Sequence, residues 1–241
     1  MRISRLYSSL TLPRSGTFTL DEGASHYLLK VLRSPLGYRF VMFDGSGFEF
    51  DVELTEATKK SATVKVHGVR DGLAESPLQS HLAIGISKGD RMDFVLQKAT
   101  ELGVSKITPL FTEHGDVKLN GDRLEKKLQH WQGVIRSACE QCSRSVLPEL
   151  CVPQRLDQLL AGENSQVKFV LYPTSDQSLQ HSDTPSSACL LIGPEGGLSQ
   201  VEIDSALGAG FVSLQLGPRV LRTETAPLAA LSLLQYLWGD F

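Results

Sequence analysis

Glycines and a carboxylate gather in one short segment whose composition suits ligand binding. Residues 190–199 read LLIGPEGGLS, an apolar run followed by a turn rich in glycine. Glycines let a backbone approach a ligand closely, and open α/β sheets bind ligands at the carboxyl ends of their strands. The segment lacks both the Gly-Lys-Ser/Thr of a phosphate-binding loop and the G-x-G-x-x-G of a dinucleotide fingerprint. Two interpretations therefore stay open, a ligand-binding loop and a plain turn from a strand into a helix.

A second segment concentrates charge at the start of the last expected helix. Residues 216–231 read LGPRVLRTETAPLAAL and include Arg219, Arg222 and Glu224. Cations and a carboxylate at a helix start suit recognition of a polar substrate. The alternative is helix capping by Thr225 with surface arginines. Two strand-edge loops of this kind in one domain favour a binding site.

Charged residues also share one face of the helix expected at residues 120–143. Arg136, Glu140 and Arg144 follow one another at intervals of four. Ordinary ion pairing along a helix explains this spacing, and a functional role is the alternative.

The sequence predicts no metal site. Cys139 and Cys142 form a C-x-x-C, but no second ligand pair is spaced to complete a zinc site. Cys142 lies on the apolar stripe of its helix, which favours buried free thiols. The six histidines are scattered, so hydrolytic and metal chemistry have no positive support.

From residue 81 onward, strands are expected to alternate with helices, which predicts a parallel α/β sheet. The expected strands are 81–87, 106–111, 167–171, 189–192 and 211–216. Four helices are expected in this part of the chain. The first is capped by Asp90, the second spans 120–143, the third begins with a Ser199/Glu202 capping box, and the fourth spans 226–238.

The first 70 residues are predicted to be mostly β. Alternating apolar residues mark strands near 38–43, 48–54 and 62–66, and a short helix is expected at 24–32. This pattern is typical of a small barrel-like domain. Residues 71–80 are small and polar, so we expect domains at 1–72 and 73–241.

Charge is distributed unevenly along a chain whose net charge is −3. Residues 1–40 hold six basic and two acidic residues, which is compatible with a local nucleic-acid footprint or with chance clustering. No apolar run reaches the roughly 18 residues of a membrane span, and the start lacks the apolar run of a signal peptide. We therefore expect a cytoplasmic protein whose four cysteines are reduced.

The two glycine-containing segments together resemble a known family. LLIGPEGGLS followed by LGPRVLRTETA is similar to the RsmE-type ribosomal RNA uracil-N3 methyltransferases of the SPOUT superfamily. KGDRM at 88–92, the following QKATELGV, ITPLF at 107–111 and RSACEQCSR at 136–144 agree with the same family. The likeness runs over nearly the whole chain and includes Arg33 in the β-rich start.

The resemblance implies a fold that periodicity alone does not predict. It implies a SPOUT-type α/β trefoil-knot methyltransferase domain preceded by a small PUA-like β-barrel that binds RNA. General topology rules treat knots as nearly absent, so the residues alone would indicate an ordinary doubly wound sheet. The resemblance also implies S-adenosylmethionine as cofactor, a homodimer with composite active sites, and one uridine of small-subunit (16S) ribosomal RNA as target.

Site residues follow from matching the family pattern. The implied cofactor-binding residues are Leu171, Tyr172, Pro173, Ile192, Gly193, Pro194, Glu195, Gly196, Gly197, Leu216, Gly217, Val220, Leu221, Thr223 and Ala226. Uracil N3 must lose a proton before it attacks, so Glu224 or Glu140 is expected to accept it. Arg222 is the first choice for stabilising the uracil anion, with Arg136 expected to act at the composite site. Arg5, Arg14 and Arg33 are the expected RNA contacts.

Two other functions remain open. The first is a SPOUT enzyme that methylates another RNA or another base atom. The second is a non-catalytic ribosome-assembly factor with a nucleoside pocket, which the charges of the RTET sequence disfavour. In every catalytic version the target base must be unpaired or flipped out of its helix.

Overall fold

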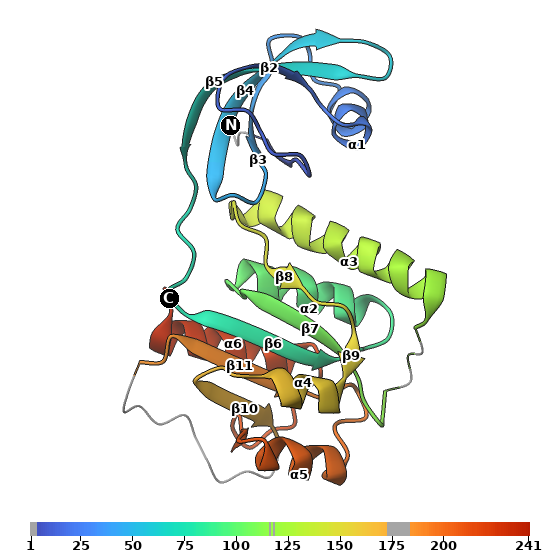
Figure 1. Ribbon diagram of the computed structural model, residues 1–241, viewed down its shortest axis with the longest axis vertical. Helices are drawn as coiled ribbons and strands as arrows, with labels where there is room; N and C mark the ends of the chain where they lie inside the picture. The colour runs from blue at the N-terminus through green and yellow to red at the C-terminus, as the bar shows by residue number, and fades with distance from the viewer. Residues whose placement is uncertain (1–3, 116, 118, 173–183) are drawn as a thin grey trace. The chain divides into compact units, whose positions relative to one another are not determined.

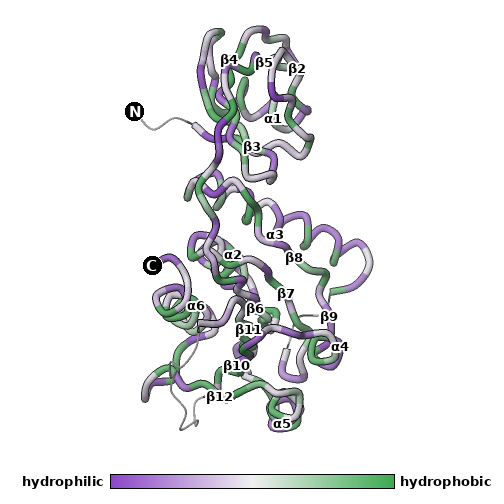
Figure 2. The backbone as a smooth tube through the Cα atoms, turned by 60° about the vertical axis from the view of Figure 1, so that its left-hand side comes forward, coloured by the Kyte–Doolittle hydropathy of each residue, from purple (hydrophilic) through white to green (hydrophobic). Residues whose placement is uncertain are grey.

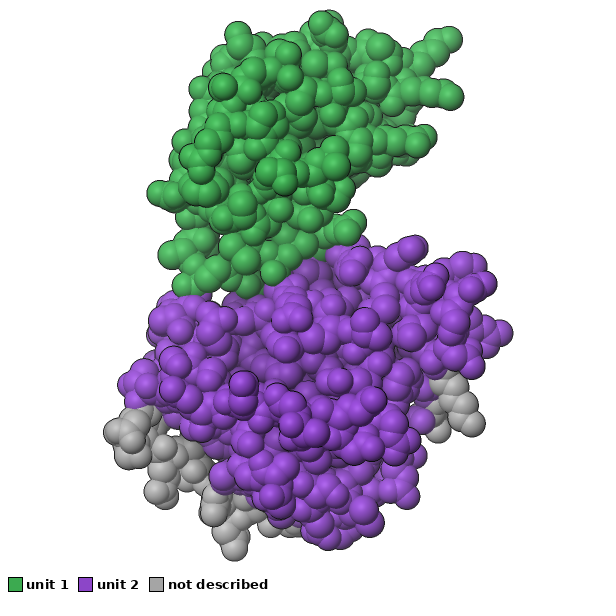
Figure 3. Space-filling model, viewed as in Figure 1, with its two compact units in different colours: residues 1–75, 136–147 green, residues 76–135, 148–241 purple. Residues whose placement is uncertain are grey.

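The computed structural model describes residues 4–115, 117, 119–172 and 184–241 and divides the chain into two compact units (Figures 1 and 3). Unit 1 comprises residues 1–75 and 136–147, and unit 2 comprises 76–135 and 148–241. The division after residue 75 falls three residues beyond the expected boundary. The end of helix α3 (Gly121–Cys142) also belongs to unit 1, which sequence patterning did not predict. Within the described ranges, no helix is long and apolar enough to cross a membrane.

Unit 1 contains a five-stranded sheet in the order β1-β3-β4-β5-β2. Its strands are β1 (Arg5–Tyr7), β2 (Gly16–Thr19), β3 (Arg39–Phe43), β4 (Phe48–Ala57) and β5 (Ala62–Asp71). β1 pairs with β3 in parallel, and the remaining pairs are antiparallel. The expected strands of this unit are therefore confirmed, and β1 and β2 are added at its edges.

The core of unit 1 follows the alternation seen in the sequence. Phe50, Val52 and Leu54 of β4 are buried in one apolar cluster with Leu28. The expected helix at 24–32 is confirmed as α1 (Glu22–His26) followed by a π-helical turn, η1 (Tyr27–Val31). Asp21 caps α1 by accepting a hydrogen bond from the Ala24 amide.

Unit 2 contains a sheet in the order β12-β10-β11-β6-β7-β8, and every pairing in it is parallel. The strands are β6 (Gln79–Gly85), β7 (Lys106–Phe111), β8 (Glu149–Leu150), β10 (Val167–Leu171), β11 (Ser187–Ile192) and β12 (Val212–Leu214). A further short strand, β9 (Gln154–Arg155), pairs with β7. The central strands β6 and β11 are buried almost throughout, which explains their continuous apolar composition.

Helices cover both faces of this sheet (Figure 1). α4 (Leu156–Gly162) and α5 (Gln200–Gly208) contribute to one apolar cluster with β10 and β11. α2 (Asp90–Glu101) packs against α6 (Thr225–Trp238), and α6 also contacts β11. α6 is apolar along most of its length (green in Figure 2), as its burial requires.

Local capping differs from expectation at one helix and agrees at another. Gly89 occupies the N-cap of α2 with a φ of 60°, so Asp90 is its first helical residue and not its cap. Glycine adopts this left-handed conformation without the steric cost of a Cβ. The Ser199/Glu202 capping box is confirmed at the start of α5.

Candidate active site

A pocket of about 600 Å³ lies in unit 2, where the end of β10 meets the loops after β11 and β12. This is the carboxyl edge of the parallel sheet, where α/β folds bind ligands. The volume falls within the range of about 300–1,000 Å³ that is usual for small-molecule and cofactor sites. Both glycine-containing segments line it, so the structure brings together the two loops that the sequence singled out.

The loop after β11 has its shape set by close backbone packing. A Cβ on Gly193 would lie 2.7 Å from backbone atoms of Gly197 and Leu198, closer than any real side chain approaches. A Cβ on Gly85, at the end of β6, would likewise lie 2.5 Å from atoms of Pro194. The Gly197 amide donates to the Pro194 carbonyl at 2.8 Å, which closes the turn. Gly193 is therefore required by the turn itself.

The loop after β12 presents side chains in place of tight backbone packing. Gly217 has a φ of 74°, and Val220 is 81% exposed. The amides of Thr225 and Ala226 both donate to the Arg222 carbonyl at 2.9 Å and begin α6. Glu224 occupies the N-cap position without a side-chain cap, so the capping expected of Thr225 is absent.

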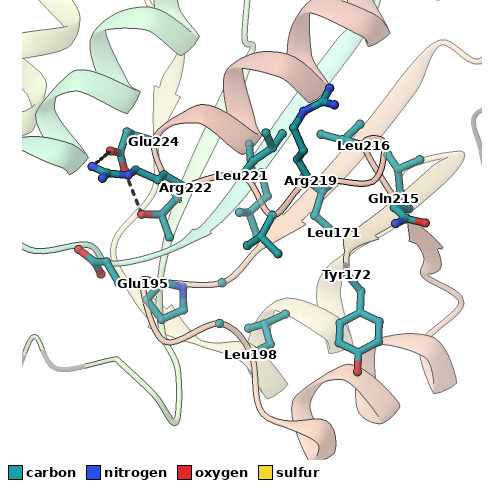
Figure 4. Close-up of a pocket in the computed structure, with 18 of the residues that line it drawn as sticks. Leu171, Tyr172, Glu195, Leu198, Gln215, Leu216, Arg219, Leu221, Arg222 and Glu224 are labelled. Carbon is teal, nitrogen blue, oxygen red and sulfur yellow. Dashed lines mark hydrogen bonds and ion pairs between the residues drawn. The ribbon is translucent and has the colours of Figure 1, made fainter. Parts of the chain in front are cut away.

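The pocket gathers acidic and basic side chains at one end and combines leucines with polar side chains at the other (Figure 4). Glu195, Arg222 and Glu224 lie toward the first end, and Leu171, Leu216 and Tyr172 lie toward the second together with Gln215 and Arg219. The leucine side chains at the second end suit the faces of an aromatic base. Charged side chains at the opposite end suit a polar or ionising group.

Four charged side chains connect three loops at the charged end. Arg91, in the first turn of α2, donates from Nη1 to Glu195 Oε1 at 2.7 Å. The Arg91 Nε lies 4.0 Å from Glu224 Oε2, and Arg222 Nη1 lies 3.9 Å from Glu224 Oε1. The Thr223 hydroxyl donates to Glu224 Oε2 at 3.3 Å. Glu224 therefore sits between two cations, while Arg222 keeps 81% of its side chain exposed.

Glu195 is held in its ionised form. Burial raises its pKa, but hydrogen bonds from its own amide, from Arg91 and from the Lys88 amide outweigh burial and lower it. The Lys88 amide donates to Glu195 Oε1 at 3.1 Å. An ionised Glu195 thus ties the loop after β6 to the loop after β11.

Most of the predicted cofactor residues line this pocket. The lining includes Leu171, Tyr172, Ile192, Gly193, Pro194, Glu195, Gly197, Leu216, Gly217, Val220, Leu221, Thr223 and Ala226, together with the predicted catalytic pair Arg222 and Glu224. Gly196 is not part of the lining and instead packs its backbone against His114, whose Cβ would lie 2.9 Å from an added side chain. Pro173 lies outside the described residues.

The other two predicted catalytic residues, Arg136 and Glu140, belong to unit 1 and do not line the pocket. The Arg136 guanidinium lies over the Tyr7 ring at 5.2 Å, and Glu140 Oε1 accepts from the Tyr7 amide at 2.9 Å. Burial raises the pKa of Glu140 above its ordinary value despite this hydrogen bond and the charges of Arg136 and Arg5. Of the four predicted catalytic residues, the described pocket lining of unit 2 includes Arg222 and Glu224.

The three arginines expected to contact RNA differ in accessibility. Arg5 has only 8% of its side chain exposed and pairs with Glu49. Its Nη2 also donates to the Arg144 carbonyl and the Ser145 hydroxyl, each at 3.1 Å. These contacts correct the expectation for Arg5, because a buried and paired guanidinium is not presented to RNA. Arg14, stacked over Phe48, and Arg33 are both exposed.

Several lining residues were not among the predicted site residues. They are Arg91, Leu198, Ile203, Leu214, Gln215 and Arg219. Arg91 had a signal, since KGDRM follows a strand at the same sheet edge. Ile203 and Leu214 had none, because each reads as an ordinary core residue of a helix or a strand.

The fold and pocket define a class of protein, an α/β protein with a ligand-sized pocket at the carboxyl edge of its parallel sheet. The chain matches the model of the RNA methyltransferase domain over residues 74–235 and that of the RNA methyltransferase PUA domain over residues 20–66. It therefore belongs to the RNA methyltransferase family in which the ribosomal RNA small subunit methyltransferases E are found. These matches confirm the expected fold class, a SPOUT-type methyltransferase domain preceded by a PUA-like domain.

Named relatives and solved structures support this assignment over the full length. The ribosomal RNA small subunit methyltransferase E of Buchnera aphidicola (subspecies Schizaphis graminum) is 35% identical, covering 99% of this chain and 98% of the relative. The Bacillus subtilis protein of the same name is 32% identical, covering 97% and 96%. A putative methyltransferase from Legionella pneumophila, solved with bound S-adenosylmethionine, is 40% identical with a TM-score of 0.96 and complete coverage of both chains. The Neisseria gonorrhoeae methyltransferase E bound to the same cofactor is 36% identical with a TM-score of 0.92, again with complete coverage.

Proposed function

We propose that this chain transfers the methyl group of S-adenosylmethionine to N3 of one uridine in small-subunit ribosomal RNA, in the cytoplasm. The observation that carries the proposal is the two-ended pocket built by the loops after β11 and β12. Two relatives that match the chain over its full length hold this cofactor in their structures, and the curated relatives carry the ribosomal RNA name.

The residues present fit this cofactor. Leu171, Leu216 and Leu221 offer apolar surfaces for the adenine faces, and the turn at Gly193 contributes to the pocket lining. The bound cofactor supplies a methyl group already activated by a sulfonium. The protein must place the attacking nitrogen in line with that methyl group.

The charged end supplies what the uracil requires. Uracil N3 carries a proton at neutral pH, so a base must accept it and the resulting anion must be stabilised. In this proposal Glu224 accepts the proton and Arg222 stabilises charge on the uracil oxygens; both residues line the pocket, 3.9 Å apart. Arg91, on the other side of Glu224, holds this carboxylate and Glu195 in position.

Unit 1 supplies RNA affinity in this proposal. Unit 1 contains the basic first 40 residues and the PUA match at 20–66, and Arg14 and Arg33 are exposed. Phosphate contacts of this kind position RNA without reading its sequence. The target uridine must be unpaired or extruded to reach a pocket of this size.

Methylation of ribosomal RNA tests the function directly. Small subunits from a deletion strain, incubated with the purified chain and S-adenosylmethionine, should gain one 3-methyluridine, detected by mass spectrometry of nuclease digests. A methyl group on another RNA or another base atom would favour the other SPOUT activity. RNA and cofactor binding without any methyl transfer would favour the non-catalytic assembly factor.

Cofactor binding at the first loop has a matched pair of variants. Gly193→Ala should reduce S-adenosylmethionine affinity by more than about tenfold, because the new Cβ meets backbone at 2.7 Å and displaces the turn. Gly208→Ala is the control, since an added Cβ there has nothing within 4 Å. Calorimetry on both folded variants decides the question. Equal affinity in the two variants would remove this loop from the site.

The homodimer with composite sites is part of the same proposal. The pocket lies in unit 2, and in this proposal Arg136 and Glu140 of unit 1 act at the site of a second copy. Co-expressed Arg222→Ala and Arg136→Ala chains should regain activity in heterodimers, because one site then carries both arginines. Verified heterodimers that stay inactive would make Arg136 a structural cation stacked on Tyr7.

A further inference from the structure

Three potential metal ligands from distant parts of the chain converge in unit 2. They are His81 of β6, Glu163 directly after α4, and Cys189 of β11. One ligand atom from each lies within 4.8 Å of the other two. His81 and Cys189 are direct register partners in neighbouring parallel strands, so their side chains project from the same face of the sheet.

The cluster is well enclosed. The exposed fraction is 8% for the His81 side chain and 6% for that of Glu163, and Cys189 is fully buried. Charged or titratable groups are rarely buried together unless they are paired or coordinate a metal. Cys189 precedes the pocket loop at Gly193 on the same strand, but none of the three residues lines that pocket.

The His81 and Glu163 side chains are each already oriented by a hydrogen bond to another residue. Thr108 Oγ1 lies 2.8 Å from His81 Nε2, and its hydroxyl can accept from a protonated Nε2. That tautomer leaves Nδ1 unprotonated, as a metal ligand must be. Glu163 Oε1 accepts from both the amide and the hydroxyl of Ser165, at 2.8 Å and 2.6 Å. The second carboxylate oxygen, Oε2, is therefore the one turned toward His81.

His81 Nδ1 and Glu163 Oε2 lie 2.6 Å apart, a hydrogen-bond distance that places a proton between the two atoms when no metal is bound. We propose that a Zn²⁺ ion replaces this proton and binds His81 Nδ1, Glu163 Oε2 and Cys189 Sγ, with water as the fourth ligand. The shared proton and the thiol proton leave to solvent, so the three ligands bind as imidazole, carboxylate and thiolate.

The types of ligand atom and their geometry favour Zn²⁺ over other divalent ions. One imidazole, one carboxylate and one thiolate suit Zn²⁺ better than Mg²⁺ or Ca²⁺, which prefer oxygen ligands alone. Tetrahedral Zn–N and Zn–O bonds of about 2.0–2.1 Å place the two ligand atoms about 3.3 Å apart. The Glu163 carboxylate must therefore retreat by less than about 1 Å.

This inference is independent of the proposed function. The cluster is separate from the residues that line the cofactor pocket, so S-adenosylmethionine affinity should not change when metal is removed. The sequence offered no spacing for this site, because its ligands come from positions 81, 163 and 189. The competing explanation is a buried His–Glu ion pair beside an inert thiol.

Metal titration of the full chain distinguishes the two explanations. The reduced protein, stripped with a chelator and dialysed, is titrated with Zn²⁺ by calorimetry and with Co²⁺ by absorbance. We expect one ion per chain, a thiolate-to-Co²⁺ charge-transfer band, and a thermal unfolding midpoint that rises with Zn²⁺ concentration. Failure to bind Zn²⁺ with a stoichiometry of one, or Co²⁺ bound without the thiolate band, overturns the proposal.

Variants assign the bound ion to these residues. Cys189→Ala should abolish the charge-transfer band, and His81→Gln should weaken Zn²⁺ affinity by more than about tenfold. Cys139→Ala, at a buried free thiol in unit 1, and His130→Gln, at an exposed His–Asp pair, are the matched controls. Both controls should keep the band and the affinity. A band that survives Cys189→Ala, or that disappears in Cys139→Ala, places the metal elsewhere and overturns the proposal.

Thr108→Val provides a variant that leaves all three ligands in place. It removes only the hydroxyl that orients His81, so the Co²⁺ band should persist while Zn²⁺ affinity falls about 10- to 100-fold. If Cys189→Ala does not fold, this variant and His81→Gln still test the site. Unchanged affinity in both would show that the ion does not bind His81.

Discussion

Two groups of arginines and carboxylates differ in how tightly the structure holds them. In unit 1, Glu49 lies between Arg5 and Arg70, and the Arg5–Glu49 pair has side chains only 8% and 10% exposed. At the pocket, Glu224 lies between Arg91 and Arg222 at 4.0 Å and 3.9 Å, and both arginines are about half exposed or more. The residue types are the same, but the distances and the exposure are not.

The difference separates a structural group from one available for chemistry. A buried guanidinium whose Nη1 and Nη2 groups are paired inside the fold, as in Arg5, is not available to a ligand, and removing a partner from such a pair leaves an unpaired charge. An exposed guanidinium with loose contacts keeps its donors for a ligand and contributes little to stability. Arginine side chains therefore cannot be assigned to function by sequence position without their surroundings.

Arg5→Ala should destabilise unit 1 strongly. The substitution leaves Glu49 buried with only Arg70 as its cationic partner, and breaking a buried pair costs about 3–5 kcal/mol. The free energy of unfolding in denaturant measures the loss. Arg39→Ala is the matched control, because Arg39 pairs with Glu53 at 3.3 Å while 70% exposed. If the free energy of unfolding fell by about 1 kcal/mol or less in both variants, the buried Arg5 pair would be no more stabilising than the exposed Arg39 pair.

The same pair should show a characteristic pH dependence. Burial raises the pKa of Glu49, but hydrogen bonds and charges from Arg5 and Arg70 outweigh it, so the pKa lies below its ordinary value of 4.5. A lowered pKa contributes stability above the unfolded value, and this contribution is lost as the pH falls through the folded value. The difference between wild type and Arg5→Ala should therefore shrink on acidification below about pH 4.5.

Arg222→Ala should affect turnover and leave stability nearly unchanged. If this guanidinium stabilises the uracil anion, losing it should lower kcat about a hundredfold by analogy with oxyanion donors. Affinity for S-adenosylmethionine should change much less, because the interaction exists only during the reaction. Arg155→Ala, equally exposed and outside the pocket lining, should have no effect on kcat. A fall in cofactor affinity equal to the fall in kcat would make Arg222 a cofactor contact.

Arg222→Lys sharpens the same test. Lysine keeps the charge but replaces the planar fork with a point charge, so it should restore activity only in part. Full activity in Arg222→Lys would show that a positive charge at position 222 is sufficient. It would contradict a role for bidentate hydrogen bonding by Arg222.

Arg14 and Arg33 should give the smallest effect, confined to RNA binding. The double change to Ala should make the salt dependence of RNA affinity shallower by about one unit for each phosphate that is no longer neutralised. Lys59 and Lys60, exposed in the turn between β4 and β5, provide a control pair of equal charge in the same unit. Binding measured at several salt concentrations decides between them. A slope that changes only in the lysine pair would place the RNA on that turn.

Local patterns were sufficient for most elements of the fold. β7 and β10 begin and end at the expected residues, and the Ser199/Glu202 box starts α5, because alternation, apolar runs and caps depend on neighbouring residues. The strands of two residues, β8 and β9, and the short helix α4 were missed, since periodicity needs a longer segment. The resemblance of the two glycine loops also sufficed to indicate the family and most of the pocket lining.

Tertiary structure decided where the polar residues singled out in the sequence lie and which partners they contact. The sequence grouped Arg5 with Arg14 and Arg33 by charge, and packing buried the first against Glu49. It grouped Arg136 with Arg222 by family pattern, and the fold placed only Arg222 in the pocket lining. His81, Glu163 and Cys189 came together through strand register and the end of α4, although they lie far apart along the chain. Burial and long-range contact are properties of the packed chain, so no local pattern of residue types can specify them.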